Sequence, residues 1–142
     1  MTKFGIQQDL SSMMVEEAAL EALNDADLSM EDVDAIVVSS IEVMSNGERQ
    51  KHSASMISSL FQKRVPILSL PAGCAGGGTA LWTAIKMQKS SSYDNILVIG
   101  FDKIIANTSQ KTTDEISMGG ERIYEQTEGL NFPAQNALVA QQ

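Results

Sequence analysis

Cys74 is the side chain of this 142-residue sequence that is best placed to act as a nucleophile. It is the only cysteine, and it follows the apolar segment 65–70 and precedes the helix-like segment 79–88 within a turn that also contains four glycines. A thiol at a strand-to-helix turn lies beside the first free N–H groups of the helix, where the helix dipole favours thiolate over thiol. The glycines leave room for a ligand to approach. The sequence therefore predicts a cysteine nucleophile whose product oxyanion is held by backbone N–H groups.

The glycine-rich turn also has competing explanations. A dinucleotide-binding G-x-G-x-x-G pattern needs a glycine where Ala75 stands, and a phosphate-binding P-loop needs a lysine where Thr79 stands. Both patterns therefore fail. A purely structural alternative stays open at this point, because lone cysteines are most often small, buried apolar residues.

The composition narrows the classes of function. The net charge is -8, and no cluster of Lys and Arg could displace counterions from a nucleic acid, so we expect no nucleic-acid partner. No apolar run approaches the roughly 20 residues of a membrane-spanning helix, and no signal peptide opens the sequence, so we expect no membrane association. A single cysteine excludes an intramolecular disulfide, which fits a cytoplasmic protein.

Helix-like and strand-like segments alternate along the chain. The helix-like segments are 10–27, 50–62 and 79–88, and the strand-like segments are 35–39, 65–70 and 96–101. This alternation, with strands that are apolar throughout, predicts an α/β fold with a mainly parallel sheet covered on both faces. We expect the third helix to bury one stripe of residues: Gly77, Ala80, Leu81, Ala84, Ile85 and Gln88. Residues 102–131 lack a clear period and are predicted to be a long loop, and Phe132-Pro133 opens a last helix.

These segments resemble the N-terminal region of the thiolase superfamily over essentially the whole chain. The resembling segments are 16–23, 32–38, Gly73–Leu81, Val98–Lys103 and Gly129–Ala134. They are closer to archaeal and sterol-carrier-type thiolases than to ketoacyl-carrier-protein synthases. Met1–Gly5 looks like the loop that follows the family's first strand. The resemblance therefore implies a partial thiolase-like N-terminal domain over residues 1–142, with a mainly parallel mixed sheet that lacks the first strand and a loop, 102–131, over the active site.

The resemblance also implies an activity. In thiolases such as acetyl-CoA acetyltransferase and 3-ketoacyl-CoA thiolase, which belong to lipid metabolism, a catalytic cysteine carries the acyl group as a thioester during Claisen condensation or thiolytic cleavage of a 3-ketoacyl-CoA. Cys74 is the matching residue, and Gly73, Ala75, Gly76 and Gly77 would support it. Coenzyme A thioesters would be substrates, with no metal and no covalently bound cofactor. The family strand that corresponds to 65–70 lies at a two-fold interface, so a homo-oligomer or a pair with another thiolase-like chain is expected.

Thiolases also need histidines, and usually a second cysteine, from a C-terminal half. The only histidine, His52, matches no family motif and is predicted to be a solvated helix residue. Without a paired base, this chain alone is expected to be inactive. Two alternatives stay open: a non-catalytic thiolase-like subunit that binds a partner chain or acyl-CoA, and an enzyme similar to 3-hydroxy-3-methylglutaryl-CoA synthase.

Overall fold

A three-stranded parallel sheet forms the centre of the protein. The computed structural model describes residues 1–41, 48, 52–104 and 109–141. Its strands are β1 (Ala35–Ser39), β2 (Ile67–Ser69) and β3 (Ile96–Gly100), in the order β2-β1-β3. The described strand pairs are both parallel, with Ile36 opposite Ile67 on one side and Leu97 on the other. This arrangement confirms the predicted α/β fold with a parallel sheet.

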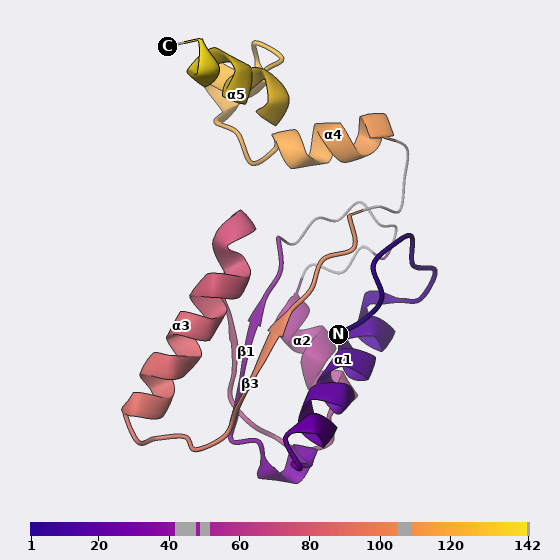
Figure 1. Ribbon diagram of the computed structural model, residues 1–142, viewed down its shortest axis with the longest axis vertical. Coiled ribbons are helices and arrows are strands. Elements are labelled where there is room, and N and C mark those ends of the chain that lie inside the picture. The colour runs from indigo at the N-terminus through magenta and orange to yellow at the C-terminus, as the bar shows by residue number, and fades with distance from the viewer. Residues whose placement is uncertain (42–47, 49–51, 105–108, 142) are drawn as a thin grey trace.

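Helices cover both faces of the sheet (Figure 1). Helices α1 (Ser11–Asp25) and α2 (Ser53–Leu60) pack on one face, where Val15, Leu23 and Ile57 join a core with side chains of β1 and β3. Helix α3 (Gly76–Lys89) packs on the other face. Strand β1 lies between them and is buried along its whole length, which agrees with its uninterrupted apolar sequence.

The predicted elements lie within a few residues of the observed ones. The first residues of the predicted helix 50–62 lie outside the described part of the chain. The predicted buried stripe of α3 is right at only two of its six residues. Ala80 and Ala84 are buried, but Gly77 and Gln88 are exposed, and Leu81 and Ile85 are 55% and 42% exposed. Leu81 and Ile85 line an apolar cavity.

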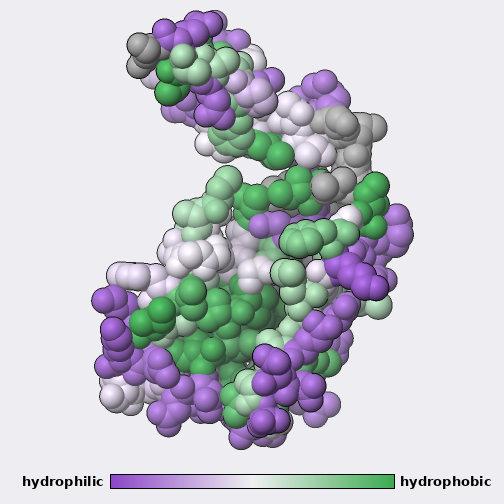
Figure 2. Space-filling view, in the orientation of Figure 1, coloured by the Kyte–Doolittle hydropathy of each residue, from purple (hydrophilic) through white to green (hydrophobic). Residues whose placement is uncertain are grey.

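That cavity lies along the outer edge of β3, which has no partner strand among the described residues. It has a volume of about 450 Å³ and is lined by residues of α1, α3 and β3. A second apolar cavity of about 830 Å³ adjoins the later part of β3, and residues of α1 and the N-terminal segment line it. Figure 2 shows the hydrophobic surface that gathers between α3 and α1. The β3 edge of the sheet is therefore open among the described residues.

The prediction of a long loop over residues 102–131 is wrong in two places. The structure contains α4 (Ser109–Ser117) and a π-helical turn (Arg122–Gln126), followed by α5 (Phe132–Ala140). These short elements depend on local polar bonds, which leave no apolar period in the sequence. Gln110 Nε2 donates to Asp114 Oδ1 at 2.9 Å, and Glu121 Oε2 accepts from the N–H groups of Ile123 and Tyr124 at 2.7 and 2.6 Å. Helices α4 and α5 lie beyond the carboxyl end of the sheet (Figure 1).

Candidate active site

Cys74 lies in the connection between β2 and α3. A single 3₁₀ turn, Gly73–Ala75, forms this connection and leads directly into the first residue of α3, Gly76. Gly73 has φ +51°, a left-handed conformation that favours glycine. The Cys74 thiol is free and the residue is exposed, so the alternative of a buried, structural cysteine is wrong.

Cys74 lines a cavity of about 400 Å³ at the carboxyl ends of the strands. Its lining residues are Ser39, Ile41, Gly73, Cys74, Gly76, Gly77, Gly100, Phe101 and Asp102. Three chain segments thus meet here: the end of β1, the turn before α3 and the end of β3. The carboxyl end of a parallel sheet is the usual position of a ligand site in open α/β folds. Of the four residues predicted to support Cys74, the cavity wall includes Gly73, Gly76 and Gly77 but not Ala75.

The glycines around Cys74 have different physical roles. Gly76 is buried, and a Cβ at this position would overlap Ser39 Oγ and lie 3.2 Å from Ser39 Cβ. Gly76 is therefore needed for packing. A Cβ at Gly77 or Gly100 would have no atom within 4 Å, so these two residues keep the cavity open. The sequence suggested room for a ligand at every glycine of the turn, and the structure supports that function at Gly77 rather than at Gly76.

Asp102 is a residue of the site whose role the sequence did not reveal. Its Oδ1 atom accepts hydrogen bonds from Ser40 Oγ at 2.9 Å and from the Ile41 N–H at 2.8 Å. The residue is exposed overall, but protein atoms crowd its carboxylate, and the loss of hydration raises the pKa of Asp102 above its usual value. The two hydrogen bonds act in the opposite direction. An acidic residue directly after a strand end was the available signal in the sequence.

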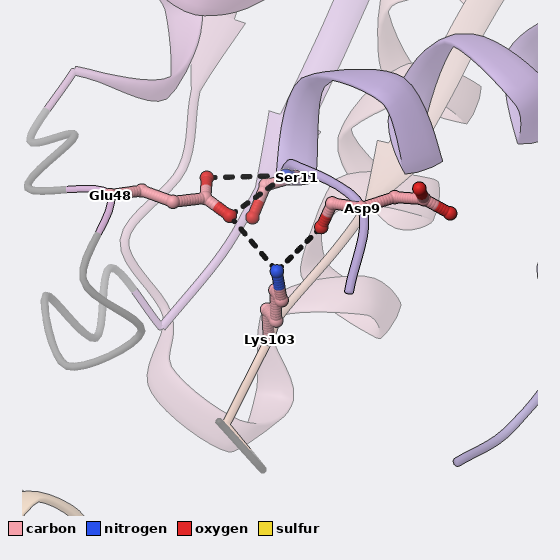
Figure 3. A network of polar contacts seen from close by, with 4 residues as sticks. All are labelled: Asp9, Ser11, Glu48 and Lys103. Carbon is pink, nitrogen blue, oxygen red and sulfur yellow. Dashed lines mark hydrogen bonds and ion pairs between the residues drawn. The ribbon is translucent and has the colours of Figure 1, made fainter. Parts of the chain in front are cut away.

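The next residue, Lys103, joins the end of β3 to the start of α1 (Figure 3). Its Nζ atom lies 2.5 Å from the Asp9 carbonyl oxygen and 3.4 Å from Glu48 Oε1. The Ser11 N–H donates to both carboxylate oxygens of Glu48, at 3.0 and 3.2 Å. Glu48 therefore caps α1, whose N-cap residue, Leu10, makes no side-chain cap bond. The side chains of Lys103 and Glu48 are only 11% and 13% exposed.

Other titratable candidates lie outside the cavity. His52 is exposed at the N-cap of α2, as predicted, and does not line the cavity. Among the described lining residues, Asp102 is the only ionisable side chain besides Cys74. No group of three His, Cys, Asp or Glu side chains in the described part of the chain could hold a metal ion. In those same residues, no helix has the length and apolar character needed to cross a membrane.

Comparison with known proteins gives a consistent set of relatives. Residues 1–138 match the family described as "Thiolase, N-terminal domain". Acetyl-CoA acetyltransferase of Methanothermobacter thermautotrophicus is 32% identical, over 98% of this chain and 36% of that protein. Beta-ketoacyl-[acyl-carrier-protein] synthase III of Psychromonas ingrahamii is 34% identical, over 81% of this chain and 35% of that protein.

A solved structure agrees with these relatives. The crystal structure of 3-oxoacyl-[acyl-carrier-protein] synthase III from Aquifex aeolicus VF5 has a TM-score of 0.60 and 31% sequence identity, and it covers 69% of this chain and 31% of that chain. The chain thus spans about a third of the length of these relatives. The thiolase resemblance is confirmed: the chain belongs to the thiolase family and matches that family's N-terminal domain.

Proposed function

We propose that this chain carries the nucleophile of a thiolase-type acyltransferase that uses coenzyme A thioesters. One observation supports this proposal above all: Cys74, a free and exposed cysteine, lines a cavity at the carboxyl ends of the strands, where α3 begins. The name of the Methanothermobacter relative, acetyl-CoA acetyltransferase, favours an acyl-CoA as the donor.

The proposed reaction begins with transfer of the acyl group to Cys74. The thiolate attacks the carbonyl carbon of the acyl-CoA, a new thioester bond forms to Sγ, and the bond between the carbonyl carbon and the coenzyme A sulfur breaks. Coenzyme A leaves as a thiolate and takes up one proton, which balances the proton lost by Cys74. The N-terminal end of α3 opens onto the same cavity through Gly76 and Gly77, and its dipole favours the negative charge that develops there.

The second step would be Claisen condensation with another acyl-CoA, or in reverse the thiolytic cleavage of a 3-ketoacyl-CoA. This step needs a base, and general acid–base help is typically worth about 10²–10⁴-fold in rate. The described cavity wall offers Asp102 as its only ionisable group beside Cys74. We therefore assign only the acyl-loading step to this chain and expect no condensation or thiolysis by it alone.

A second candidate has support from the two synthase III relatives. Their names specify a beta-ketoacyl-[acyl-carrier-protein] synthase, so an acyl chain on a carrier protein is an alternative acceptor in the second step. The two candidates share the acylation of Cys74 and differ in the acceptor. A non-catalytic subunit would differ from both, because it would bind an acyl-CoA without becoming acylated.

Intact-mass spectrometry tests the shared step. The purified chain is incubated with acetyl-CoA, and we expect it to gain the mass of one acetyl group, which peptide mapping locates at Cys74. Cys74→Ser is the matched control because it nearly keeps the size of the side chain and removes the thiol. Reversible binding of acetyl-CoA without a change in protein mass would favour the non-catalytic subunit. If the chain neither binds acetyl-CoA nor becomes acylated, the proposed function is contradicted.

A further inference from the structure

We propose that Asp102 is a positioning residue for the Cys74 cavity, because it binds Ser40 and Ile41, and Ile41 lines that cavity together with Cys74. This inference extends the proposed function, on which its acyl-transfer readout depends. Ile41, Cys74 and Asp102 all line the same cavity. Asp102 would therefore act on the acyl-loading step through the cavity wall and not through contact with the reacting atoms.

Strands β1 and β3 are bonded to each other up to their carboxyl ends. The Phe101 N–H donates to the Ser39 carbonyl oxygen at 3.2 Å, at the end of the pairing between these strands. One residue further along, the Oδ1 atom of Asp102 accepts the Ile41 N–H at 2.8 Å, and it also accepts the Ser40 hydroxyl at 2.9 Å. A side-chain oxygen thus joins the two chain segments at the point where they enter the cavity wall.

Ser39 connects this wall to the turn that contains Cys74. Ser39 directly precedes Ser40, and its Oγ atom donates to the Leu70 carbonyl oxygen at 2.9 Å, just before the turn. The same Oγ atom lies against Gly76, two residues after Cys74. Displacement of Ser40 and Ile41 would therefore change both the wall opposite the thiol and the support beneath the start of α3.

The hydrogen bonds of Asp102 can be distinguished from its negative charge. Both bonds are accepted by one oxygen atom, Oδ1, and an asparagine offers an equivalent oxygen. The surroundings of Asp102 disfavour its charge, since the loss of hydration raises its pKa. Positioning should thus need the acceptor oxygen and not the negative charge, so Asp102→Asn should preserve the effect and Asp102→Ala should abolish it.

The experiment compares two reactions of Cys74 in the full 142-residue chain. The first is acylation by acetyl-CoA over a range of concentrations, and the second is alkylation by iodoacetamide. A misplaced reacting group can cost roughly 10²-fold in rate, so we expect Asp102→Ala to slow maximal acylation by at least about tenfold. Iodoacetamide is small and needs no fixed wall, so its rate should change by less than about threefold on the same reasoning. Asp102→Asn should stay within about threefold of the wild type in both reactions.

Two further variants complete the design. Ser40→Ala removes one of the two donors and should give an intermediate loss of acylation. Asp25→Ala removes an exposed carboxylate at the end of α1, away from the cavity, and should leave both rates unchanged. If circular dichroism shows that Asp102→Ala is unfolded, Asp102→Asn and Ser40→Ala are used for the test. The inference is then overturned if Ser40→Ala is acylated at the wild-type rate and Asp102→Asn is acylated about ten times more slowly.

Several results would overturn the inference. The first is an acylation rate in Asp102→Ala that equals the wild-type rate. The second is an equal loss of acylation rate in Asp102→Ala and Asp102→Asn. The third is a parallel loss of the acylation and alkylation rates in Asp102→Ala, which a general loss of structure would produce. If the wild-type chain is not acylated at all, the proposed function fails, and hydrogen exchange then tests Asp102 independently. Asp102→Ala, but not Asp102→Asn, must speed exchange of the Ile41 amide, and an Ile41 amide that stays protected in Asp102→Ala refutes the positioning role.

Discussion

Ser39, the last residue of β1, and Gly76, the first residue of α3, approach so closely that no side chain fits between them. This contact fixes the start of α3 against the centre of the sheet, and Cys74 lies in the turn that ends there. The site thus depends on the absence of a side chain at one position as much as on the thiol.

Gly76→Ala should destabilise the protein. The added methyl group would overlap Ser39 Oγ, and overpacking of this kind typically costs about 1–3 kcal/mol. Gly78→Ala is the matched control, because a Cβ there has no atom within 4 Å and the residue lies in the same helix, where alanine is favoured over glycine by about 0.5–1 kcal/mol. Urea unfolding of both variants measures the difference. Equal effects of the two substitutions would show that the contact with Ser39 is unimportant.

Asp34 should contribute to stability in a pH-dependent way. Its Oδ2 atom accepts the N–H groups of Asn95 and Asp94 at 2.9 and 3.0 Å, and these bonds hold the pKa of Asp34 below its usual value. Because the folded-state pKa is the lower one, this stability is present above the unfolded-state value of about 3.9 and is lost as the pH falls through the folded-state value.

The substitution Asp34→Asn tests this dependence. Urea midpoints measured from neutral to acidic pH should decline less steeply in the variant than in the wild type below about pH 4. Asp25→Asn removes an exposed carboxylate of α1 and should follow the wild-type curve. Parallel curves for Asp34→Asn and the wild type would rule out a contribution from these two hydrogen bonds.

The Lys103–Glu48 pair should be worth more than a surface ion pair. Both side chains are largely buried, so Lys103→Met removes a charge that pairs with the Glu48 carboxylate and should cost about 1–3 kcal/mol of unfolding free energy. Glu48→Gln should also destabilise the protein. The loss of unfolding free energy in the double variant should be about 1 kcal/mol smaller than the sum of the two single losses.

The N-terminal amine of Met1 and Glu21 provide a control for that experiment. They form an ion pair, and the side chains of Met1 and Glu21 are 79% and 57% exposed. Glu21→Gln should therefore change the unfolding free energy by less than about 1 kcal/mol. Strict additivity of Lys103→Met and Glu48→Gln would mean that the two residues act independently.

Strand β2 should contribute to self-association. It pairs with β1, and its other edge has no partner among the described residues, which leaves a template for a second strand. Light scattering should detect a dimer of the wild-type chain, and Leu68→Lys should shift it toward monomer. Leu20→Lys, a change of an exposed α1 residue, should not do so. A wild-type monomer at tens of micromolar, or an intact Leu68→Lys dimer, would exclude β2 as the interface. Phe61, near the end of α2, lies in the core of its own chain and is 8% exposed, so we expect no contribution from it to this interface.

The sequence was most informative where local pattern and structure coincide. Strand β1 has the predicted bounds because its apolar run is buried on both faces, and the cysteine turn was recognisable from its glycines. The roles of Asp102 and Lys103 were not recognisable, because their partners Ile41 and Glu48 lie 61 and 55 residues away and meet them only once the strand order is known. Helix α4 was missed since its polar side chains bond locally and give no apolar period.

The open edge of β3 has a consequence for how the chain unfolds. Its accessible surface is 9627 Å², about a third more than the roughly 7,100 Å² expected for a compact monomer of this length. The heat-capacity change and the urea m-value of unfolding both grow with the surface that unfolding newly exposes. Both should therefore be small for this chain, and its thermal transition should be broad. Any strand or partner that covers the edge should sharpen that transition, which gives a calorimetric readout of binding before the partner is known.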